Sequence, residues 1–125
     1  MRVILDTSFL LFLVESGRDV ISIIEDKLGE PVHPLVPDLV LGELRRLAGQ
    51  AGRLSGKARM ALEIAAKMEE LKTGETGQVD EKLVELSLRL GNPVVTVDSG
   101  LEKLLRKMGV KCIYVNRRLE VYVLT

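Results

Sequence analysis

The amino-acid sequence predicts an α/β protein, a three-layer sandwich in which helices cover both faces of a mainly parallel sheet. Short apolar runs without alternation, at 3–5 and 94–97, are typical of strands buried on both faces. Segments with apolar residues at helical spacing separate such runs, which is the pattern of parallel βαβ units. With 46% hydrophobic residues, 3% aromatic residues and no Trp, the core is expected to be aliphatic.

The first half of the chain is expected to form two strands and four helices. The strands are expected at 3–5 and within 30–37, and the helices at 8–17, at 19–28, from 37 onward and at 57–71. Gly17 and Gly29 follow the first two helices, where glycine readily takes the left-handed conformation of a C-cap. Three prolines in 30–37 allow a short strand at most, near an edge of the sheet. Pro37 suits the first position of the third helix, where its missing N–H would have been unpaired anyway.

The second half is expected to form two helices and three strands. The helices are expected at 79–90 and 98–108, and the strands at 94–97, 111–115 and 119–124. Residues 72–78 contain two glycines and two threonines and are expected to form a flexible loop. The last two strands lie close enough in sequence to pair as a hairpin, so the sheet is expected to be mixed at one edge.

Length and composition exclude several classes of protein and site. A chain of 125 residues suits a single domain, 1–125. The single Cys112 lies in a predicted strand and is expected to be a buried structural thiol, and no Cys and His cluster is available for zinc. The single His33 is interpreted as a solvated or hydrogen-bonded loop residue rather than a catalytic one. Without a signal-peptide pattern or a run long enough to span a bilayer, a cytoplasmic protein with no membrane partner is expected.

Four carboxylates occupy distinctive positions. Asp6 and Asp98 each follow a predicted buried strand, and ligands of open α/β sheets bind outside the carboxyl ends of the strands. Glu43 lies on the apolar stripe of the third helix, and Asp80 opens the fifth. Clustered carboxylate oxygens suit Mg²⁺ or Mn²⁺, which could activate water and neutralise charge on a phosphodiester.

Each acid also has an explanation without a metal. Asp6, Asp80 and Asp98 each come at the start of a predicted helix, where Asp is a favoured N-cap. Glu43 could pair with Arg46 three residues later, or lie at the margin of the apolar stripe. Asn caps helices as well as Asp but lacks its charge, so replacing Asp by Asn separates the capping and metal interpretations.

The cations are unevenly distributed, although 18 Lys and Arg balance 18 Asp and Glu. Four acids alone would repel RNA, so a nuclease site needs cations beside it. The segment 44–67 holds six cations against one acid, and its candidates for RNA contact are Arg45, Arg46, Arg53, Lys57 and Arg59. The alternative is that this block is a solvated helix face.

The order of these motifs resembles the PIN-domain family of metal-dependent ribonucleases over essentially the whole chain. The motifs are Leu5-Asp6-Thr7-Ser8, Pro37 through Glu43-Leu44, Val79-Asp80, Val95-Thr96-Val97-Asp98 and Gly109-Val110. The resemblance implies a five-stranded sheet, Mg²⁺ or Mn²⁺ as cofactor, cleavage of single-stranded RNA and frequent homodimers. It assigns catalysis and metal binding to Asp6, Glu43, Asp80 and Asp98, and polar supporting positions to Thr7 or Ser8 and Thr96.

Two departures from the family pattern bear on the metal. Val97 stands where the family often has Asn, and Gly100 stands where an acid is frequent, so one ion rather than two is expected.

The resemblance leaves three roles open. The protein could be the toxin of a toxin–antitoxin pair, blocked by an antitoxin protein, or a nuclease of rRNA processing that meets ribosome-assembly factors. Residues 109–121 look more like the second. A non-catalytic module that binds RNA or protein is the third role, and the presence of all four acids argues against it.

Overall fold

The computed structural model describes residues 1–125 and contains one six-stranded sheet in the order β3-β2-β1-β4-β5-β6. The strands are β1 (Arg2–Leu5), β2 (His33–Pro37), β3 (Glu69–Leu71), β4 (Val94–Thr96), β5 (Cys112–Val115) and β6 (Val121–Leu124). Neighbours from β3 to β5 pair in parallel, and only β6 pairs antiparallel, with β5. The predicted α/β class and the mixed edge are therefore confirmed, with one strand more than expected.

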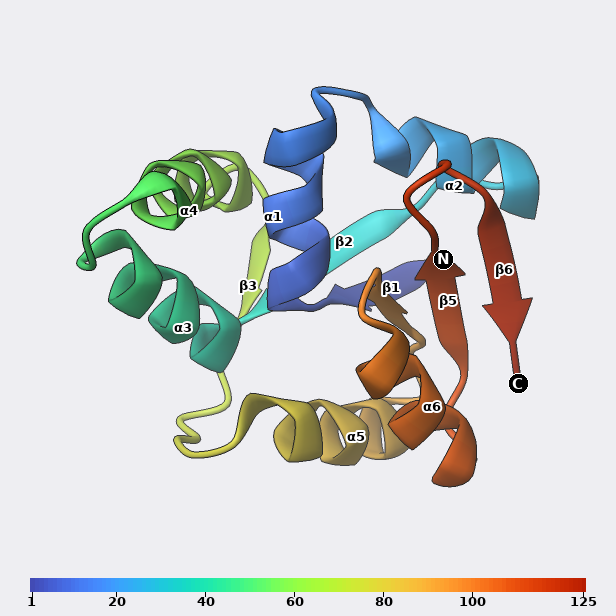
Figure 1. Cartoon of the computed structure of the whole chain (residues 1–125). Coiled ribbons are helices and arrows are strands. Elements are labelled where there is room, and N and C mark those ends of the chain that lie inside the picture. The colour runs from blue at the N-terminus through green and yellow to red at the C-terminus, as the bar shows by residue number, and fades with distance from the viewer.

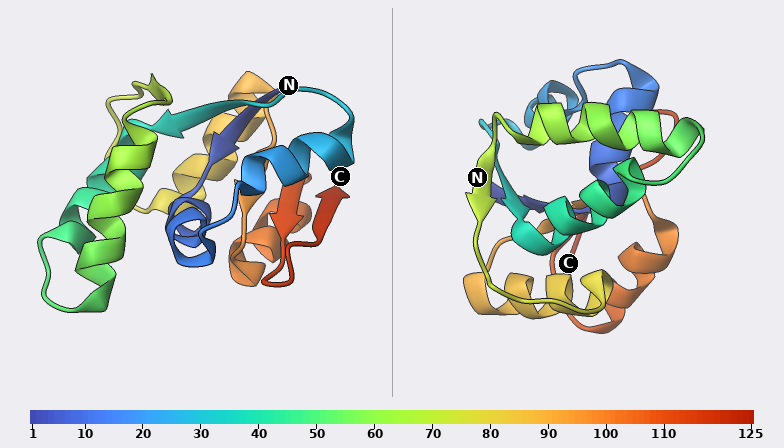
Figure 2. Two further views of the ribbon diagram at one scale, coloured as in Figure 1. Left: turned by 90° about the horizontal axis from the view of Figure 1, so that it is seen from above. Right: turned by 90° about the vertical axis from the view of Figure 1, so that its left-hand side faces the viewer.

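Helices cover both faces of this sheet. They are α1 (Thr7–Ser16), α2 (Val20–Leu28), α3 (Asp38–Ala48), α4 (Arg53–Ala65), α5 (Val79–Leu90) and α6 (Ser99–Lys107). Figure 1 shows α1, α2 and α4 on one side and α5 and α6 on the other. Helix α3 packs against α4 and α1, and the side view in Figure 2 shows the sheet between α4 and α5.

The additional strand, β3, was expected to be the end of a helix. Helix α4 was placed at 57–71, but it begins at Arg53 and ends at Ala65, with Gly56 inside it. The last residues of the expected helix instead pair with β2, where Glu69 lies opposite Leu35. Two consecutive glutamates suit a short exposed edge strand, because charges on an edge oppose pairing with other chains.

Strand β2 is short and lies one strand from the edge, as its prolines predict, and Pro34 and Pro37 stand at its second and last positions. Pro37 is the last residue of β2 and the N-cap of α3, with φ −62° and ψ 145°, rather than the first helical residue as predicted. His33 is exposed and hydrogen-bonded as expected, 2.9 Å from Glu69, but it lies on β2 rather than in a loop.

The core is aliphatic, as the composition predicts. Val3, Ile4 and Leu5 are buried in the sheet, and both phenylalanines are buried residues of α1. Cys112 is a buried free thiol whose pKa is raised to about 12, first by burial and then by the charges of Glu102 and Asp6. None of the helices has the length and hydropathy needed to cross a membrane.

The strand order brings the carboxyl ends of β1 and β4 together. Connections from β1 lead to β2 on one side, whereas β4 lies on the other side, so the direction of the chain across the sheet reverses between them. Ligands of open α/β sheets bind at such a switch point. Asp6 directly follows β1, and Asp98 follows β4 by two residues.

Candidate active site

Asp6 is held rigidly at the end of β1. Its carboxylate accepts hydrogen bonds from the backbone N–H of Phe9 (2.8 Å), from the Ser8 hydroxyl (2.9 Å to Oδ2) and from the Thr96 hydroxyl (2.6 Å). The bond from Phe9 caps α1, as the capping interpretation expected. Only 4% of Asp6 is exposed. Burial raises its pKa to about 7 against the lowering effect of these three donors, and the charge of Asp98 adds to the increase.

Thr96 and Ser8 connect Asp6 to the end of β4. The Thr96 Oγ1 accepts from the Asp98 backbone N–H (3.0 Å) and lies 3.2 Å from the Ser8 Oγ. The Val97 N–H donates to Ser8 Oγ at 3.3 Å. Two of the three predicted supporting side chains therefore contact Asp6 directly. The third, Thr7, has a buried hydroxyl without a hydrogen-bond partner.

Asp98 caps α6 through one of its two carboxylate oxygens. Its Oδ1 accepts from the N–H groups of Gly100 (2.8 Å) and Leu101 (3.2 Å). Its Oδ2 accepts no hydrogen bond. One carboxylate can therefore serve as a cap and still present an oxygen to a ligand.

Asp80 does not cap its helix. Helix α5 begins at Val79 with Gln78 as its N-cap, so Asp80 lies inside the first turn and accepts no capping hydrogen bond. Its pKa is raised, first by desolvation and then by the charges of Asp98 and Glu43. The capping interpretation thus holds for Asp6 and Asp98 and is wrong for Asp80.

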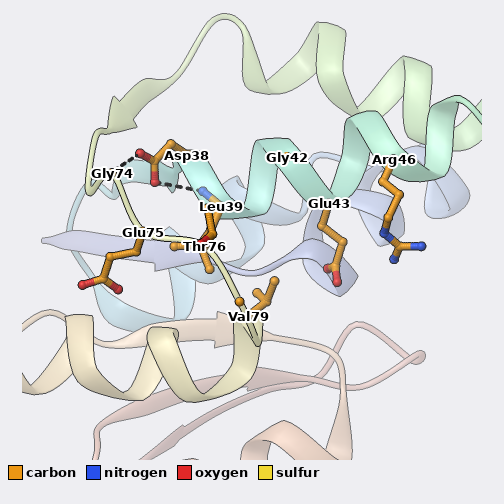
Figure 3. Close-up of a pocket in the computed structure, with 10 residues that line it drawn as sticks. Asp38, Leu39, Gly42, Glu43, Arg46, Gly74, Glu75, Thr76 and Val79 are labelled. Atoms are coloured by element: carbon orange, nitrogen blue, oxygen red, sulfur yellow. Dashed lines mark hydrogen bonds between the residues drawn. The ribbon is translucent and has the colours of Figure 1, made fainter.

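Glu43 lies partly buried on α3 and forms neither a hydrogen bond nor a salt bridge. The predicted alternative, an ion pair with Arg46, is absent. Figure 3 shows the side chains of both residues directed to the same side of α3. Glu43 is therefore a carboxylate without a protein partner.

One pocket of about 370 Å³ brings the four acids together. Asp6, Glu43, Asp80 and Asp98 all line it, together with Thr7 and Ser8. These four residues come from the ends of two strands and from two helices that are far apart in sequence. Burial raises the pKa of both Asp6 and Asp80, and the charges of neighbouring acids in the pocket raise both further. A cation in the pocket would relieve this repulsion.

The donor set of this pocket fits a hard divalent cation. The side chains of the pocket that could ligate a metal offer carboxylate and hydroxyl oxygens. Neither His nor Cys lines the pocket, and such an oxygen set is what Mg²⁺ and Mn²⁺ prefer. Thr7, whose buried hydroxyl has no hydrogen-bond partner, also lines the pocket. The carboxylates are not drawn together to coordination distance, since no three of them form a metal-binding group. The oxygen donors of the pocket fit Mg²⁺ or Mn²⁺, but the carboxylates lie farther apart than the ligands of a bound ion would.

Of the five candidate RNA-binding cations, only Arg46 lines the pocket. Lys57 lies 3.9 Å from Glu15, and Arg59 donates to the carbonyl oxygen of Ala48. Arg45 and Arg53 are exposed without salt bridges. Arg46 also makes no ion pair, so its guanidinium is available to an anionic ligand beside the acids.

Asp38 is a polar residue near the site that the sequence interpretation missed. Its carboxylate accepts hydrogen bonds from the N–H groups of Leu39, Thr73 and Gly74 (each 2.9 Å) and from the Thr73 hydroxyl (2.6 Å). Burial opposes ionisation, but these donors outweigh it and lower the pKa of Asp38. An Asp directly after Pro37 at a helix start is the sequence signal that marks this residue.

Comparison with solved structures finds the same fold in other proteins. The PIN domain endonuclease Utp24 aligns with a TM-score of 0.78 and 26% identity, over 98% of this chain and 90% of that one. A domain of a functionally unknown protein from Methanocaldococcus jannaschii aligns with a TM-score of 0.65 and 19% identity, over 92% and 91%. VapBC2 from Rickettsia felis, solved with a promoter DNA fragment, aligns with a TM-score of 0.59 and 13% identity, over 82% of this chain and 92% of that one.

The family assignment rests on the sequence match as well as the fold. No curated protein matches this chain. The profile described as "PIN like domain" matches residues 3–118, which include the four acids and the whole of strands β2 to β5. The chain therefore belongs to the PIN-like domain family, whose members are generally nucleases that use divalent metal ions.

Proposed function

We propose that this protein is a divalent-metal-dependent endoribonuclease that hydrolyses phosphodiester bonds in single-stranded RNA. The observation that carries the proposal is the single pocket lined by Asp6, Glu43, Asp80 and Asp98. The family of nucleases to which the chain belongs and its 26% identity to the endonuclease Utp24 support the same chemistry.

In this proposal Asp6, Glu43, Asp80 and Asp98 hold Mg²⁺ or Mn²⁺. The bound ion would supply positive charge to the phosphodiester and lower the pKa of an attacking water. Ser8 and Thr96 fix the orientation of the Asp6 carboxylate through their hydroxyl groups. Arg46, which makes no ion pair, contacts the phosphate and offsets the negative field of the acids.

We place rRNA processing before the toxin role, because residues 109–121 look more like PIN proteins of rRNA processing. The chain is more similar to Utp24 than to VapBC2, both in identity (26% against 13%) and in TM-score (0.78 against 0.59). A homodimer, an antitoxin and ribosome-assembly factors as partners stay predictions.

The test is cleavage of a set of structured and single-stranded RNAs by purified protein in Mn²⁺ or in EDTA. We expect internal cleavage in Mn²⁺ and none in EDTA, because without the ion nothing activates the attacking water or neutralises the charge that builds on the phosphodiester. The Asp6→Asn variant is expected to be inactive. Asp19→Asn is the matched control, since Asp19 caps α2 and bonds Ser22 but lies away from the pocket.

Cleavage that survives chelation, or that Asp6→Asn retains in full, would show that another site or a contaminant is responsible. RNA binding without cleavage in Mn²⁺ would instead support the non-catalytic role.

A further inference from the structure

The acidic pocket opens into a longer groove. A second cavity of about 470 Å³ and a third of about 490 Å³ adjoin it, and all three share Glu43, Arg46 and Val79. We call the third cavity the outer groove. Asp38, Leu39 and Gly42 of α3 form one wall, and residues 74–77 form the other. Figure 3 shows the 74–79 segment running beside α3 over this space.

The second wall depends on Asp38 for its position. Residues 72–77 make no backbone–backbone hydrogen bond, so regular structure does not hold them. The Asp38 carboxylate instead accepts three hydrogen bonds from Thr73 and Gly74, between 2.6 and 2.9 Å. The Thr73 hydroxyl in turn accepts the N–H of Glu75 at 3.1 Å. One side chain of α3 therefore fixes the distance between the two walls.

The charges of the outer groove leave one cation free. The Asp38 carboxylate already accepts four hydrogen bonds from the protein. The Glu75 carboxylate lies 3.9 Å from the ammonium of Lys82. Glu43 belongs to the proposed metal site. Arg46, at the junction with the acidic pocket, has no ion pair and is the group available to a phosphate.

The groove is open because glycine lines it. A Cβ atom added at Gly42 would meet no atom within 4 Å, although this residue lies in the middle of α3. An exposed glycine within a helix lowers helix stability. At Gly42 the missing side chain leaves the α3 wall of the outer groove open.

We propose that the outer groove is the path along which a single RNA strand reaches the acidic pocket, with Asp38 as the positioning residue of its wall. This inference rests on the proposed nuclease function and names where its substrate lies. The continuity of the cavities, the free Arg46 at their junction and the tethered wall together carry it.

Filling the groove tests the path directly. Gly42→Leu adds a side chain whose Cβ atom meets no other atom within 4 Å, and leucine has the better helix propensity, so the variant is expected to be at least as stable as wild type. Gly56→Leu is the matched control, because Gly56 is also inside a helix, α4, with nothing within 4 Å of its Cβ position. We expect Gly42→Leu to weaken binding of a labelled single-stranded RNA by about tenfold or more, and Gly56→Leu by less than about twofold.

Binding is measured by fluorescence anisotropy in EDTA and the KM for cleavage in Mn²⁺. Mn²⁺ affinity, measured by calorimetry, is expected to stay within about twofold of wild type in both variants. Equal RNA affinity and KM in Gly42→Leu and Gly56→Leu would overturn the proposed path. Wild-type protein that binds no RNA in either condition would overturn it as well.

Removing the Asp38 carboxylate, which holds the 74–77 wall through Thr73 and Gly74, tests the positioning role of Asp38. Asp38→Ala is expected to speed amide hydrogen exchange at Thr73 and Gly74 by about tenfold and to raise the Kd and KM for RNA severalfold, with kcat little changed. Helix α5 is anchored in the core by Leu83 and Leu86, so Mn²⁺ affinity is expected to persist. Asp19→Ala removes an Asp side chain that likewise accepts hydrogen bonds at the start of a helix, α2, and is expected to change none of these values beyond about twofold.

The results separate the groove from the nuclease. Faster exchange in Asp38→Ala with unchanged RNA affinity and KM would contradict the positioning role. Loss of RNA affinity in Gly42→Leu together with a wild-type protein that never cleaves would support the groove and reject the nuclease. Cleavage by wild type together with an unchanged KM in Gly42→Leu would support the nuclease and reject the groove as the RNA path.

Discussion

Asp98→Asn is expected to lower kcat/KM for RNA cleavage by about 10³-fold or more while leaving the metal-free protein folded. The reason is that the two oxygens of this carboxylate have different roles, one in capping α6 and the other in binding the ion. Both capping hydrogen bonds reach Oδ1, which Asn retains. Oδ2 accepts no hydrogen bond, and Asn replaces it by an NH₂ group that cannot bind a cation. Cleavage assays in Mn²⁺ and thermal unfolding in EDTA measure the two effects.

Asp19→Asn serves again as the control, because it makes the same chemical change at an N-cap outside the pocket. Both variants are expected to unfold within about 1 kcal/mol of wild type in EDTA. An Asp98→Asn variant that unfolds like wild type and also cleaves like wild type would reduce Asp98 to a helix cap.

Metal-free wild-type protein is expected to lose stability as the pH rises from 5 to 8, because Asp6 ionises while buried. A pKa raised from 3.8 to about 7 means that the folded state binds the proton more tightly than the unfolded state. The contribution of this group is therefore greatest below pH 4, falls between pH 4 and 7, and is constant above that range. Between pH 5 and 8 the expected loss is about 2 to 3 kcal/mol.

Asp6→Asn removes this loss. Asn can keep the cap from the Phe9 N–H, and the Ser8 and Thr96 hydroxyls can turn to accept from its NH₂ group. Measured by urea unfolding in EDTA, the variant is expected to gain stability over wild type progressively from pH 5 to 8, by about 2 to 3 kcal/mol. Parallel stability curves for the two proteins would mean that Asp6 is already ionised at pH 5.

The fold was predictable where apolar periodicity is strong. The buried strands before Asp6 and Asp98 and the helices between them follow from such runs. Strand β3 was not predictable, because Glu69 and Glu70 carry no apolar alternation and the strand forms only by pairing with β2. Pairing partners far apart in sequence leave no local signal.

The sequence was sufficient to predict which acidic residues form the site, but most of the contacts around them could not be predicted. Asp6 and Asp98 follow strands that the topology places side by side, so their meeting could be expected. The role of Asp38 could not, because it depends on Thr73 and Gly74, 35 and 36 residues away in a segment without regular structure. The separation of Arg46 from the other cations likewise depends on which face of α3 meets α5.

The central claim is that four distant carboxylates share one divalent ion, and anomalous diffraction from crystals soaked in MnCl₂ tests it most directly. We predict a manganese peak enclosed by Asp6, Glu43, Asp80 and Asp98, which is absent from crystals of Asp98→Asn. A manganese peak elsewhere on the protein, or none in the pocket at a concentration that supports cleavage, would contradict the account.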